Sequence, residues 1–386
     1  MNNFGFDTEG HEVVTAFADQ VKGKTFLITG PTAGGIGAET AIALAAASPS
    51  TIILIGRSAV KGQITVDKIK QVNPAVRVKF VEAELSSVKS IRKAAQTILD
   101  DTSIPVIHTI INNAGIMVPP YSVTEDGFES QFATNHLSHF LLVNKLVPKL
   151  VAAGSSRVIN VSSVGNKYSG MNWDDVHFKT TYTPQKGYSQ SKTAQILFSV
   201  SLNKKLASKG VRSYALDPGS VQTGLAKYIS LEIAEDMAQK IAGKSLEEAK
   251  ASRRKTVPQG CATTLVAALD PALGDGVYLA DCKITSDPAC VSAWALDEEE
   301  AERCWTLSEE CKKGVRKAGY KSIVITKPRQ TRYRATHFAA IIEQIKDSLS
   351  DNAKSALQAA KLHESTTETA WRNDITDDVN EDKHYF

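Results

Sequence analysis

The sequence predicts an α/β fold: a doubly wound parallel sheet in a single domain, with a helical extension toward the C-terminus. Three observations predict it. Short β-branched runs alternate with alanine-rich or amphipathic runs through the first two thirds of the chain. The expected strands are apolar throughout, which is typical of parallel strands buried on both faces. A glycine-rich turn separates the first strand from the helix that follows it. This order implies right-handed crossovers that place helices on both faces of the sheet.

The elements can be placed in order along the chain. We expect strands at residues 25–29, 51–55, 76–83, 106–112, 157–163 and 211–217. A helix is expected at residues 38–47, and a long helical stretch precedes each of the last two strands. In this architecture ligands bind outside the carboxyl ends of the strands. The strand ends are therefore where functional residues should lie.

Changes in composition along the chain mark the domain boundaries. We expect a lead-in helix within residues 1–20, the main domain at 21–312, and a helical substrate lid at about 222–256. Residues 313–386 form an extension of unknown role, and its acidic, polar last part is expected to be disordered. One helical face of this extension is apolar, formed by Phe338, Ile341, Ile342, Ile345 and Leu349. Such a helix could lie on a membrane, extend a dimer interface or pack back onto the domain.

The composition argues against several classes of protein. A net charge of +3 on 386 residues is too small to indicate a nucleic-acid partner. The first residues lack the basic and apolar regions of a secretory signal, and the most apolar stretch, 41–55, is interrupted and too short to cross a bilayer. Five cysteines without a CxxC, and histidines without zinc-like spacing, indicate reduced thiols and no metal site. We therefore predict a cytoplasmic protein, with weak peripheral membrane association left open.

The glycine-rich turn at residues 29–37 is suited to binding phosphate. Glycines such as Gly30 and Gly37 let the backbone turn sharply and approach a pyrophosphate without a Cβ in the way. The helix that follows offers unpaired N–H groups and the positive end of its dipole to an anion. The position of this turn between the first strand and the first helix favours dinucleotide binding over a simple tight turn.

The end of the second expected strand indicates which nucleotide binds. A carboxylate there would hold the two ribose hydroxyls of NAD, but no acid lies between residues 51 and 61. Arg57 can instead bind a 2′-phosphate with its fork of donors, and Ser58 can add a hydroxyl. The alternative is that Arg57 is a solvated surface residue. The sequence favours NADP(H) as the cofactor.

A tyrosine and a lysine four residues apart, Tyr188 and Lys192, suggest acid–base chemistry. Residues at this spacing share one helix face, so the phenol and the ammonium project together. A nearby lysine favours the phenolate and should lower the tyrosine pKa, while the protonated phenol can donate to a carbonyl oxygen. Alone, this pair could be an ordinary helix-surface pair.

Five motifs in order give the pair its context: TG…GIG at 29–37, NNAG at 112–115, two serines at 162 and 163, YSQSK at 188–192, and PGSVQT at 218–223. From about residue 22 to about residue 310 the chain resembles the short-chain dehydrogenase/reductase family, which has a Rossmann-type fold. Within that family it is most similar to the retinol-dehydrogenase-like branch and its fungal relatives, through INNAGIM, FATNHLSHFLL and the residues that follow Tyr188.

The resemblance implies a set of cofactor contacts. The glycine turn is one residue longer than the family's, so Gly34 or Gly35 takes the middle role, and we favour Gly35 because GIG matches the family's ending. Residues 218–223 are implied to contact the nicotinamide carboxamide. The expected cofactor-binding residues are Gly30, Gly35, Ile36, Gly37, Arg57, Ser58, Glu84, Leu85, Asn113, Ala114, Gly115, Tyr188, Lys192, Pro218, Gly219, Val221 and Thr223.

The resemblance also implies catalytic roles. Ser163, in preference to Ser162, would hydrogen-bond the substrate oxygen, and Tyr188 would give or take the proton. Lys192 would hold the nicotinamide ribose and tune Tyr188, while Asn135 would anchor a water linking Lys192 to solvent. Two residues depart from the family pattern: Glu84 replaces an aspartate, and Asp217 stands where close relatives often have histidine. The sequence does not explain the second departure.

The 25-residue interval from Ser163 to Tyr188 is rich in aromatic residues. The resemblance implies that it helps to shape an apolar substrate pocket, and the alternative is a surface loop with a few buried aromatics. His177 within it is expected to be structural rather than catalytic. The side chains in question are Met171, Trp173, His177, Phe178 and Tyr182.

Together these features predict an NADP(H)-dependent oxidoreductase that interconverts an alcohol and a ketone or aldehyde on a small apolar substrate. One alternative is a non-catalytic NADP(H)-sensing regulator, against which the presence of Ser163, Tyr188 and Lys192 argues. Another is an extended-type epimerase or dehydratase, for which the residues after Thr223 show no nucleotide-binding domain. The resemblance implies a homo-oligomer as a further possibility.

Overall fold

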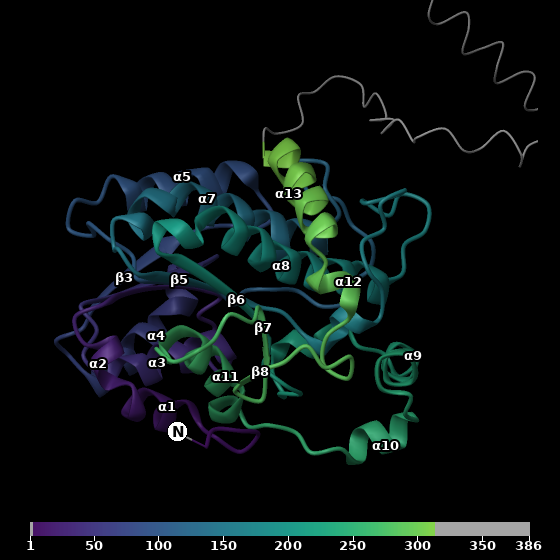
Figure 1. The fold of residues 1–386 in the computed structure, drawn as a ribbon, viewed down its shortest axis with the longest axis horizontal. Coiled ribbons are helices and arrows are strands. Elements are labelled where there is room, and N and C mark those ends of the chain that lie inside the picture. Colours follow the sequence, from purple (N-terminus) through teal and green to yellow (C-terminus); the bar gives the residue numbers. More distant parts are fainter. Residues whose placement is uncertain (1–2, 313–386) are drawn as a thin grey trace, which may run out of the picture. The chain divides into compact units, whose positions relative to one another are not determined.

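The computed structural model describes residues 3–312, and its centre is one eight-stranded sheet with the order β3-β2-β1-β4-β5-β6-β7-β8 (Figure 1). Strands β1 to β7 are parallel to their neighbours, and β8 is antiparallel to β7. The strands are β1 Thr25–Thr29, β2 Thr51–Gly56, β3 Arg77–Glu82, β4 Thr109–Asn112, β5 Ser156–Val161, β6 Val211–Asp217, β7 Tyr278–Ala280 and β8 Lys283–Ile284. The predicted doubly wound α/β fold is confirmed.

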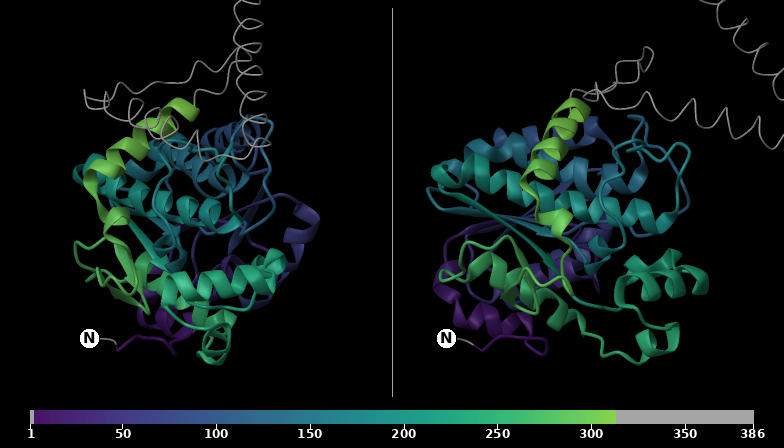
Figure 2. Two further views of the ribbon diagram at one scale, coloured as in Figure 1. Left: turned by 90° about the vertical axis from the view of Figure 1, so that its right-hand side faces the viewer. Right: turned by 45° about the vertical axis from the view of Figure 1, so that its right-hand side comes forward.

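Helices cover both faces of this sheet (Figures 1 and 2). The α-helices are α1 Gly10–Ala16, α2 Ala18–Val21, α3 Ile36–Ala45, α4 Ala59–Val72, α5 Val88–Leu99, α6 Ser130–Phe132, α7 Ser138–Val151, α8 Pro184–Leu206, α9 Leu231–Ala242, α10 Leu246–Ala251, α11 Val257–Leu269, α12 Ala293–Leu296 and α13 Glu298–Lys312. Short helical turns are η1 Ala133–Leu137, η2 Val164–Lys167, η3 Ala207–Lys209 and η4 Gly224–Tyr228.

Successive residues of each strand point to opposite faces, so the sheet divides the core in two. Phe26 and Ile28 of β1 pack with α1, α3 and α11, whereas Leu27 packs on the other face with α5, α7 and α8. All three β1 side chains are at most 1% exposed. The uninterrupted apolar run at 25–29 is therefore explained by burial on both sides. It also places the carboxyl end of β1 inside the sheet, between β2 and β4.

The sheet order reverses between β1 and β4, because β2 and β3 extend to one side and β5 to β8 to the other. The strand ends next to this reversal are where doubly wound proteins bind ligands. The glycine turn follows β1, and the sequence around Asn113 follows β4. The fold therefore brings the first two of the five motifs, the glycine turn and NNAG, to the same edge of the sheet.

The structure differs from the sequence prediction at several boundaries. Strand β4 begins three residues later than predicted, at Thr109, and β5 ends at Val161, so both serines follow the strand. The lead-in region contains two short helices, α1 and α2, rather than one. The short strands β7 and β8 and the helix α13 were not predicted. The extension predicted at 313–386 lies outside the described residues.

Two further findings concern the described part of the chain. No helix within residues 3–312 is long and apolar enough to cross a membrane. All five cysteines are free thiols, and Cys261, Cys282 and Cys304 are buried. Burial raises the pKa of these three thiols, so they remain protonated at neutral pH.

Candidate active site

The phosphate-binding turn is shaped by glycines with different tasks. Gly30 has φ +73°, and a Cβ on it would lie 2.9 Å from Cα of Ala114. A Cβ on Gly37 would lie 2.3 Å from Nδ2 of Asn113, so no side chain fits there. Gly34 takes the left-handed conformation at φ +76°, while Gly35 is the N-cap of α3. The extra residue of this turn is thus accommodated by two glycines used in different ways.

The turn leaves the start of α3 available to an anion. Gly35 offers no side chain to cap α3, and a Cβ at Gly34 would meet nothing within 4 Å. The N–H groups of the first helical turn, from Ile36 onward, therefore have no side-chain cap, and they lie at the positive end of the helix dipole. These features fit the pyrophosphate of a dinucleotide.

The segment after β4 is bonded to the glycine turn. The Thr29 hydroxyl accepts the backbone N–H groups of Asn113 and Ala114, each at 3.0 Å. The Asn113 amide donates to the Thr29 carbonyl at 2.9 Å, so this side chain supports the turn rather than projecting from it. A Cβ on Gly115 would lie 3.1 Å from Oδ1 of Asn135. The NNAG motif therefore joins the phosphate turn to the catalytic region.

The end of β2 presents Arg57 to solvent, with 72% of its side chain exposed and Nη1 4.0 Å from Oε2 of Glu84. The Ser58 hydroxyl caps α4 by accepting the Lys61 N–H at 3.3 Å. Glu82 on the neighbouring β3 pairs in register with Gly56 and accepts the Ala59 N–H at 2.8 Å. The sequence did not indicate Glu82 here, because β3 brings it across a strand pairing, whereas Glu84, already expected near the cofactor, follows β3.

Leu85 follows β3 and is 8% exposed. Its side chain belongs to the core between the sheet and α5 and α7. A contact to the adenine from this segment would therefore come mainly from its backbone.

Tyr188 and Lys192 lie one turn apart on α8, whose N-terminus is capped by the Thr183 hydroxyl. Both side chains are buried, at 3% and 4% exposure. The Ser163 hydroxyl is near enough to the Tyr188 hydroxyl to lower the pKa of the phenol. A Cβ on Gly165 would lie 2.9 Å from Cε1 of Tyr188, so this glycine lets the phenol ring approach the turn after β5. Ser163, Tyr188 and Lys192 are thus brought together as the motifs implied.

Of the two serines, Ser163 faces the phenol. Its hydroxyl also accepts the Gly165 N–H at 3.0 Å, at the start of η2. The Ser162 hydroxyl instead donates to the Lys192 carbonyl at 2.8 Å and is buried. Ser162 therefore anchors α8 to β5, and Ser163 is the serine placed to contact a reacting oxygen.

The Lys192 ammonium does not bond to the phenol. It donates to the Val161 carbonyl and to Oε1 of Gln195, each at 2.9 Å, and lies 5.6 Å from the centre of the Tyr188 ring. Burial lowers the pKa of Lys192 to about 7. Burial also raises the pKa of Tyr188 above its usual value, against an opposing effect of the Ser163 hydrogen bond.

The prediction that Lys192 lowers the pKa of Tyr188 is therefore wrong when only the groups of the protein act on the phenol. The physical reason is that both groups are removed from water, which disfavours their charged forms. The lysine is too weakly coupled to the phenol oxygen to reverse this, because it lies over the ring and bonds elsewhere. Tyr188 is consequently held in its protonated, proton-donating form.

Asn135 lies within a π-helical turn, η1, that joins α6 to α7. Its amide accepts the Ile116 N–H at 2.8 Å and donates to the Ile116 carbonyl and the Ser191 hydroxyl, each at 2.9 Å. The buried side chain thus ties the segment after β4 to α8. π-Helical turns are frequent at functional sites. Among the described contacts, the Asn135 side chain positions the catalytic helix, and the water-anchoring role remains a prediction.

The segment after β6 forms the remaining side of the site. Pro218 is buried and Gly219 has φ +83°, while Val221 pairs with Lys255 in an isolated parallel bridge. The Thr223 hydroxyl caps η4 by accepting the Leu225 N–H at 3.3 Å. These residues lead from the sheet directly into the predicted lid, where α9 and α10 lie (Figure 1).

The aromatic interval before Tyr188 is anchored to the protein interior. The Tyr182 hydroxyl donates to the Pro119 carbonyl at 2.8 Å, and the Trp173 indole donates to Glu300 at 2.7 Å. His177 packs against Phe128 and Phe132, and burial lowers its pKa to about 4. These contacts favour a structural role for His177 over a catalytic one.

Sequence reasoning missed several residues that complete the site. Gln195 receives the Lys192 ammonium, and Gly165 makes room for the phenol. Gln195 follows Lys192 by three residues on α8, so helical spacing could have indicated it. Lys255 lies far from the other motifs in sequence, and no pattern marked it.

Comparison with known proteins identifies the family. The sequence profile of short chain dehydrogenases matches residues 24–234. Human retinol dehydrogenase 12 is 35% identical over 293 residues, 75% of this chain and 87% of that protein. The short-chain dehydrogenase/reductase prx1 of Penicillium roqueforti is 35% identical over 308 residues, 75% of this chain and 85% of the relative. The chloroplastic short-chain dehydrogenase TIC 32 A of Brassica napus is 34% identical over 296 residues, which are 74% of this chain and 87% of that protein.

Solved structures agree with this assignment. An uncharacterized protein from Mycobacterium paratuberculosis shares 31% identity with a TM-score of 0.57, covering 76% of this chain and 94% of that one. A short-chain type dehydrogenase/reductase from Mycobacterium marinum shares the fold, with 19% identity and a TM-score of 0.53. The match covers 69% of this chain and 98% of that one. The chain therefore belongs to the short-chain dehydrogenase/reductase family of oxidoreductases, and it resembles the retinol dehydrogenases and fungal reductases within that family.

Proposed function

We propose that this protein interconverts an alcohol and a ketone or aldehyde with NADP(H), and that Tyr188 is the proton donor and acceptor. The observation that carries the proposal is the cluster of half-buried Ser163 with buried Tyr188 and Lys192 near the carboxyl end of β5. Nicotinamide supplies and accepts the hydride when it is bound. The protein residues then provide the binding, the orientation and the proton.

In the reductive direction, each residue has a defined task. The neighbouring hydroxyls of Ser163 and Tyr188 both donate to the oxygen of the substrate carbonyl, which replaces their contact with each other. Tyr188 transfers its proton to that oxygen as negative charge develops on it. Lys192 supplies positive charge beside the ring when protonated, and its pKa of about 7 places that change in the physiological range. Oxidation runs the same steps in reverse, with the Tyr188 phenolate as the base.

The experiment that tests this activity is a panel of apolar aldehydes and ketones, each incubated with the purified protein and NADPH. Loss of NADPH absorbance and formation of the matching alcohol would support it. Tight NADPH binding without turnover of any member would favour the non-catalytic regulator instead. Tyr188→Phe, analysed in the Discussion, links any turnover to the proposed proton donor.

The preference for NADP(H) rests on Arg57. Its exposed guanidinium lies at the carboxyl end of β2, where a 2′-phosphate would be placed, and its nearest carboxylate, Glu84, is at the limit of an ion pair at 4.0 Å. A phosphate could therefore displace this weak contact at little cost.

Arg57→Ala should weaken NADPH binding by about tenfold, the value of one charge-assisted hydrogen bond, and leave NADH binding unchanged. Calorimetry with both cofactors measures the two effects. Lys68→Ala, on the exposed face of α4, removes the same charge and is the matched control. Equal affinity of the unaltered protein for the two cofactors would contradict the preference.

An apolar substrate is supported by the lid and by the relatives. Leu225, Tyr228, Ile229 and Leu231 are exposed large apolar residues at and after η4, next to the segment that leads out of the site. A relative named retinol dehydrogenase is named for an apolar alcohol. We further propose a cytoplasmic location, with weak peripheral membrane contact or self-association as properties to be measured by fractionation and by sedimentation.

A further inference from the structure

Asp217, which departs from the family pattern, joins two strand ends of the active site. It is the last residue of β6, and its carboxylate accepts the Gly219 N–H at 3.2 Å. The N–H of Val164, the residue after Ser163, is near enough to lower the pKa of the same carboxyl. Asp217 thus lies between the turn that carries the catalytic serine and the turn that begins the proposed nicotinamide-binding segment.

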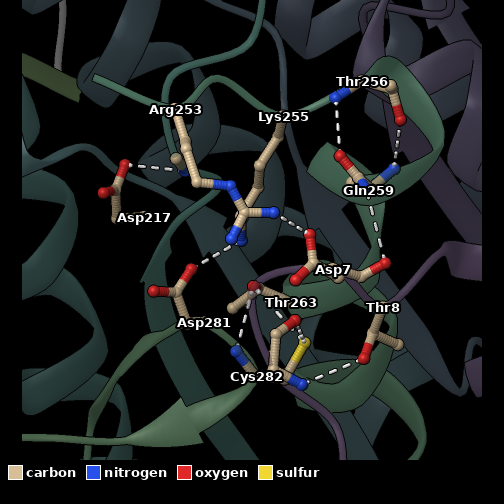
Figure 3. Close-up of polar contacts among 12 residues, drawn as sticks. Asp7, Thr8, Asp217, Arg253, Lys255, Thr256, Gln259, Thr263, Asp281 and Cys282 are labelled. Atoms are coloured by element: carbon tan, nitrogen blue, oxygen red, sulfur yellow. Dashed lines mark hydrogen bonds and ion pairs between the residues drawn. The ribbon is translucent and has the colours of Figure 1, made fainter. Parts of the chain in front are cut away.

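Lys255 contacts the same segment, and its ammonium pairs with Asp281 rather than with Asp217 (Figure 3). None of its side chain is exposed, and its Nζ is 2.6 Å from Oδ1 of Asp281, in the hairpin turn between β7 and β8. Its methylene stem packs on Gly219, where a Cβ would lie 3.0 Å from Cδ. Its backbone N–H donates to the Ser220 carbonyl at 2.9 Å.

The Asp281 carboxylate is presented by an unusual turn. Asp281 and Cys282 both have positive φ, at 44° and 64°, although neither is glycine. Such a conformation costs free energy and persists only where the surroundings impose it. The hydrogen bond from the Cys282 N–H to the Thr263 hydroxyl, at 3.2 Å, is one such restraint (Figure 3). The turn delivers a carboxylate to an ammonium that would otherwise be buried without a partner.

We propose that Asp217 and Lys255 are a positioning pair for the oxidoreductase reaction, holding Ser163 and the 218–223 segment in place and acting on Tyr188 and Lys192 through the charge of Asp217. The inference rests on the function proposed above and adds two residues to it. It also gives Asp217 a buried cationic neighbour, because the positive charge of Lys255 favours the ionised carboxylate.

The charges around Asp217 support a direct effect on catalysis. Its negative charge raises the pKa of both Tyr188 and Lys192. Burial raises the pKa of Asp217 itself, whereas the positive charge of Lys255 favours its ionised form. The other titratable groups coupled to Asp217 are Asp281, Tyr278 and Cys290. Among these named groups Lys255 is the cation that opposes the burial of Asp217.

Asp217→Asn tests the pair, because it keeps an oxygen acceptor and removes the charge. The pH at the midpoint of the Lys192 titration can be measured by NMR of lysine labelled with carbon-13 at Cε, with the signal assigned by Lys192→Met. In Asp217→Asn this midpoint should be lower than in the unaltered protein by about half a pH unit or more. Asp275→Asn is the matched control, since that side chain is 90% exposed and pairs with Arg212. If Asn at 217 prevents folding, Asp217→His replaces it. An unchanged Lys192 midpoint in a folded variant would overturn the proposal.

Lys255→Met completes the experiment. It keeps the stem on Gly219 and removes the charge that favours ionised Asp217, so the Lys192 midpoint should again fall. In the double variant with Asp217→Asn the two shifts should not add, since both act through one carboxylate. Full additivity would contradict a coupled pair. With a confirmed substrate, Asp217→Asn should also lower the pH midpoint of alcohol oxidation, because the charge that disfavours the phenolate is gone.

The titration separates this proposal from the proposed function. The titration requires no substrate. An absence of turnover would therefore count against the proposed oxidoreductase activity, while the change in the Lys192 titration midpoint would still test the role of Asp217. Normal turnover together with an unchanged Lys192 titration midpoint would support the oxidoreductase function and contradict the role of the Asp217–Lys255 pair.

Discussion

The catalytic helix and the lid differ in how they are held. In α8, Tyr188, Lys192 and most of their neighbours are buried between the sheet and α13. In η4, α9 and α10 no residue is buried, and these elements lie outside the helical layers (Figures 1 and 2). Local stability follows buried apolar contacts, so opening the lid should cost far less than disturbing α8. The catalytic residues lie on the rigid α8, and the elements expected to control access to them are weakly held.

The largest effect should come from the rigid part. Tyr188→Phe keeps the ring packed against Gly165 and removes the hydroxyl next to Ser163. Turnover should fall by about 10²–10⁴, the usual worth of general acid–base catalysis, while NADPH binding is preserved. Steady-state kinetics and a binding titration on the same preparation measure both. Near-normal turnover of the Phe variant would mean that another group donates the proton.

The second effect concerns stability at the same site. Lys192 is buried and its pKa is lowered to about 7, so below that pH the folded protein holds a costly buried ammonium. Between about pH 7 and the ordinary lysine pKa, the unfolded chain binds more protons than the folded one, and stability due to this group rises with pH. Lys192→Met should therefore stabilise the protein most at pH 6. The gain in free energy of unfolding should be a few kcal/mol, once the loss of the two Lys192 hydrogen bonds is subtracted.

Thermal unfolding between pH 6 and pH 10 checks the sign. The advantage of Lys192→Met should shrink as the pH rises, because the unaltered lysine is then buried without charge. Lys209→Met, at an exposed lysine after α8, should show no such trend. A constant difference across the pH range would show that Lys192 titrates normally. Activity should fall in the variant, so that function and stability oppose each other at this residue.

The rigid part was also the part that could be predicted from sequence. The apolar run at 25–29, the glycine turn and the Tyr188–Lys192 spacing each depend on local geometry, and all lie in the regular architecture of the sheet. Glu82, near the end of β2, was missed because β3 contributes it across a strand pairing: Gly56 is opposite Glu82, 26 residues later in the chain.

The same limit explains the other omissions. The pKa of Tyr188 depends on how completely the packed helix is removed from water, which spacing on one helix does not reveal. The strands β7 and β8 are only three and two residues long, too short for a periodicity to mark them. Asp281 reaches Lys255 only because those strands form a hairpin. Local patterns thus predicted the elements, and tertiary contacts determined the electrostatics.

The smallest effect should come from the lid, where a polar cluster joins α9 to the body. Asp236 accepts the Tyr168 hydroxyl at 2.6 Å and the Gln185 amide at 2.9 Å, and it pairs with Lys240 at 3.2 Å. Lys240 in turn donates to the Tyr168 hydroxyl at 2.8 Å. These four residues, one after η2, one on α8 and two on α9, link the lid to the end of the catalytic turn.

Asp236→Asn removes the charge of this cluster and should loosen α9 without altering Tyr188. Because the cluster is partly exposed, its ion pair is screened and contributes little by itself, so we expect KM to rise two- to fivefold, equivalent to about 1 kcal/mol. The value of kcat should stay the same, or increase if product release limits it. Amide hydrogen exchange should become faster in α9 and remain unchanged in α8. Glu235→Gln, the adjacent exposed carboxylate, is the matched control. A fall in kcat with unchanged KM would show that Asp236 acts on the chemical step, and the division between a rigid catalytic helix and a separately held lid would then be wrong.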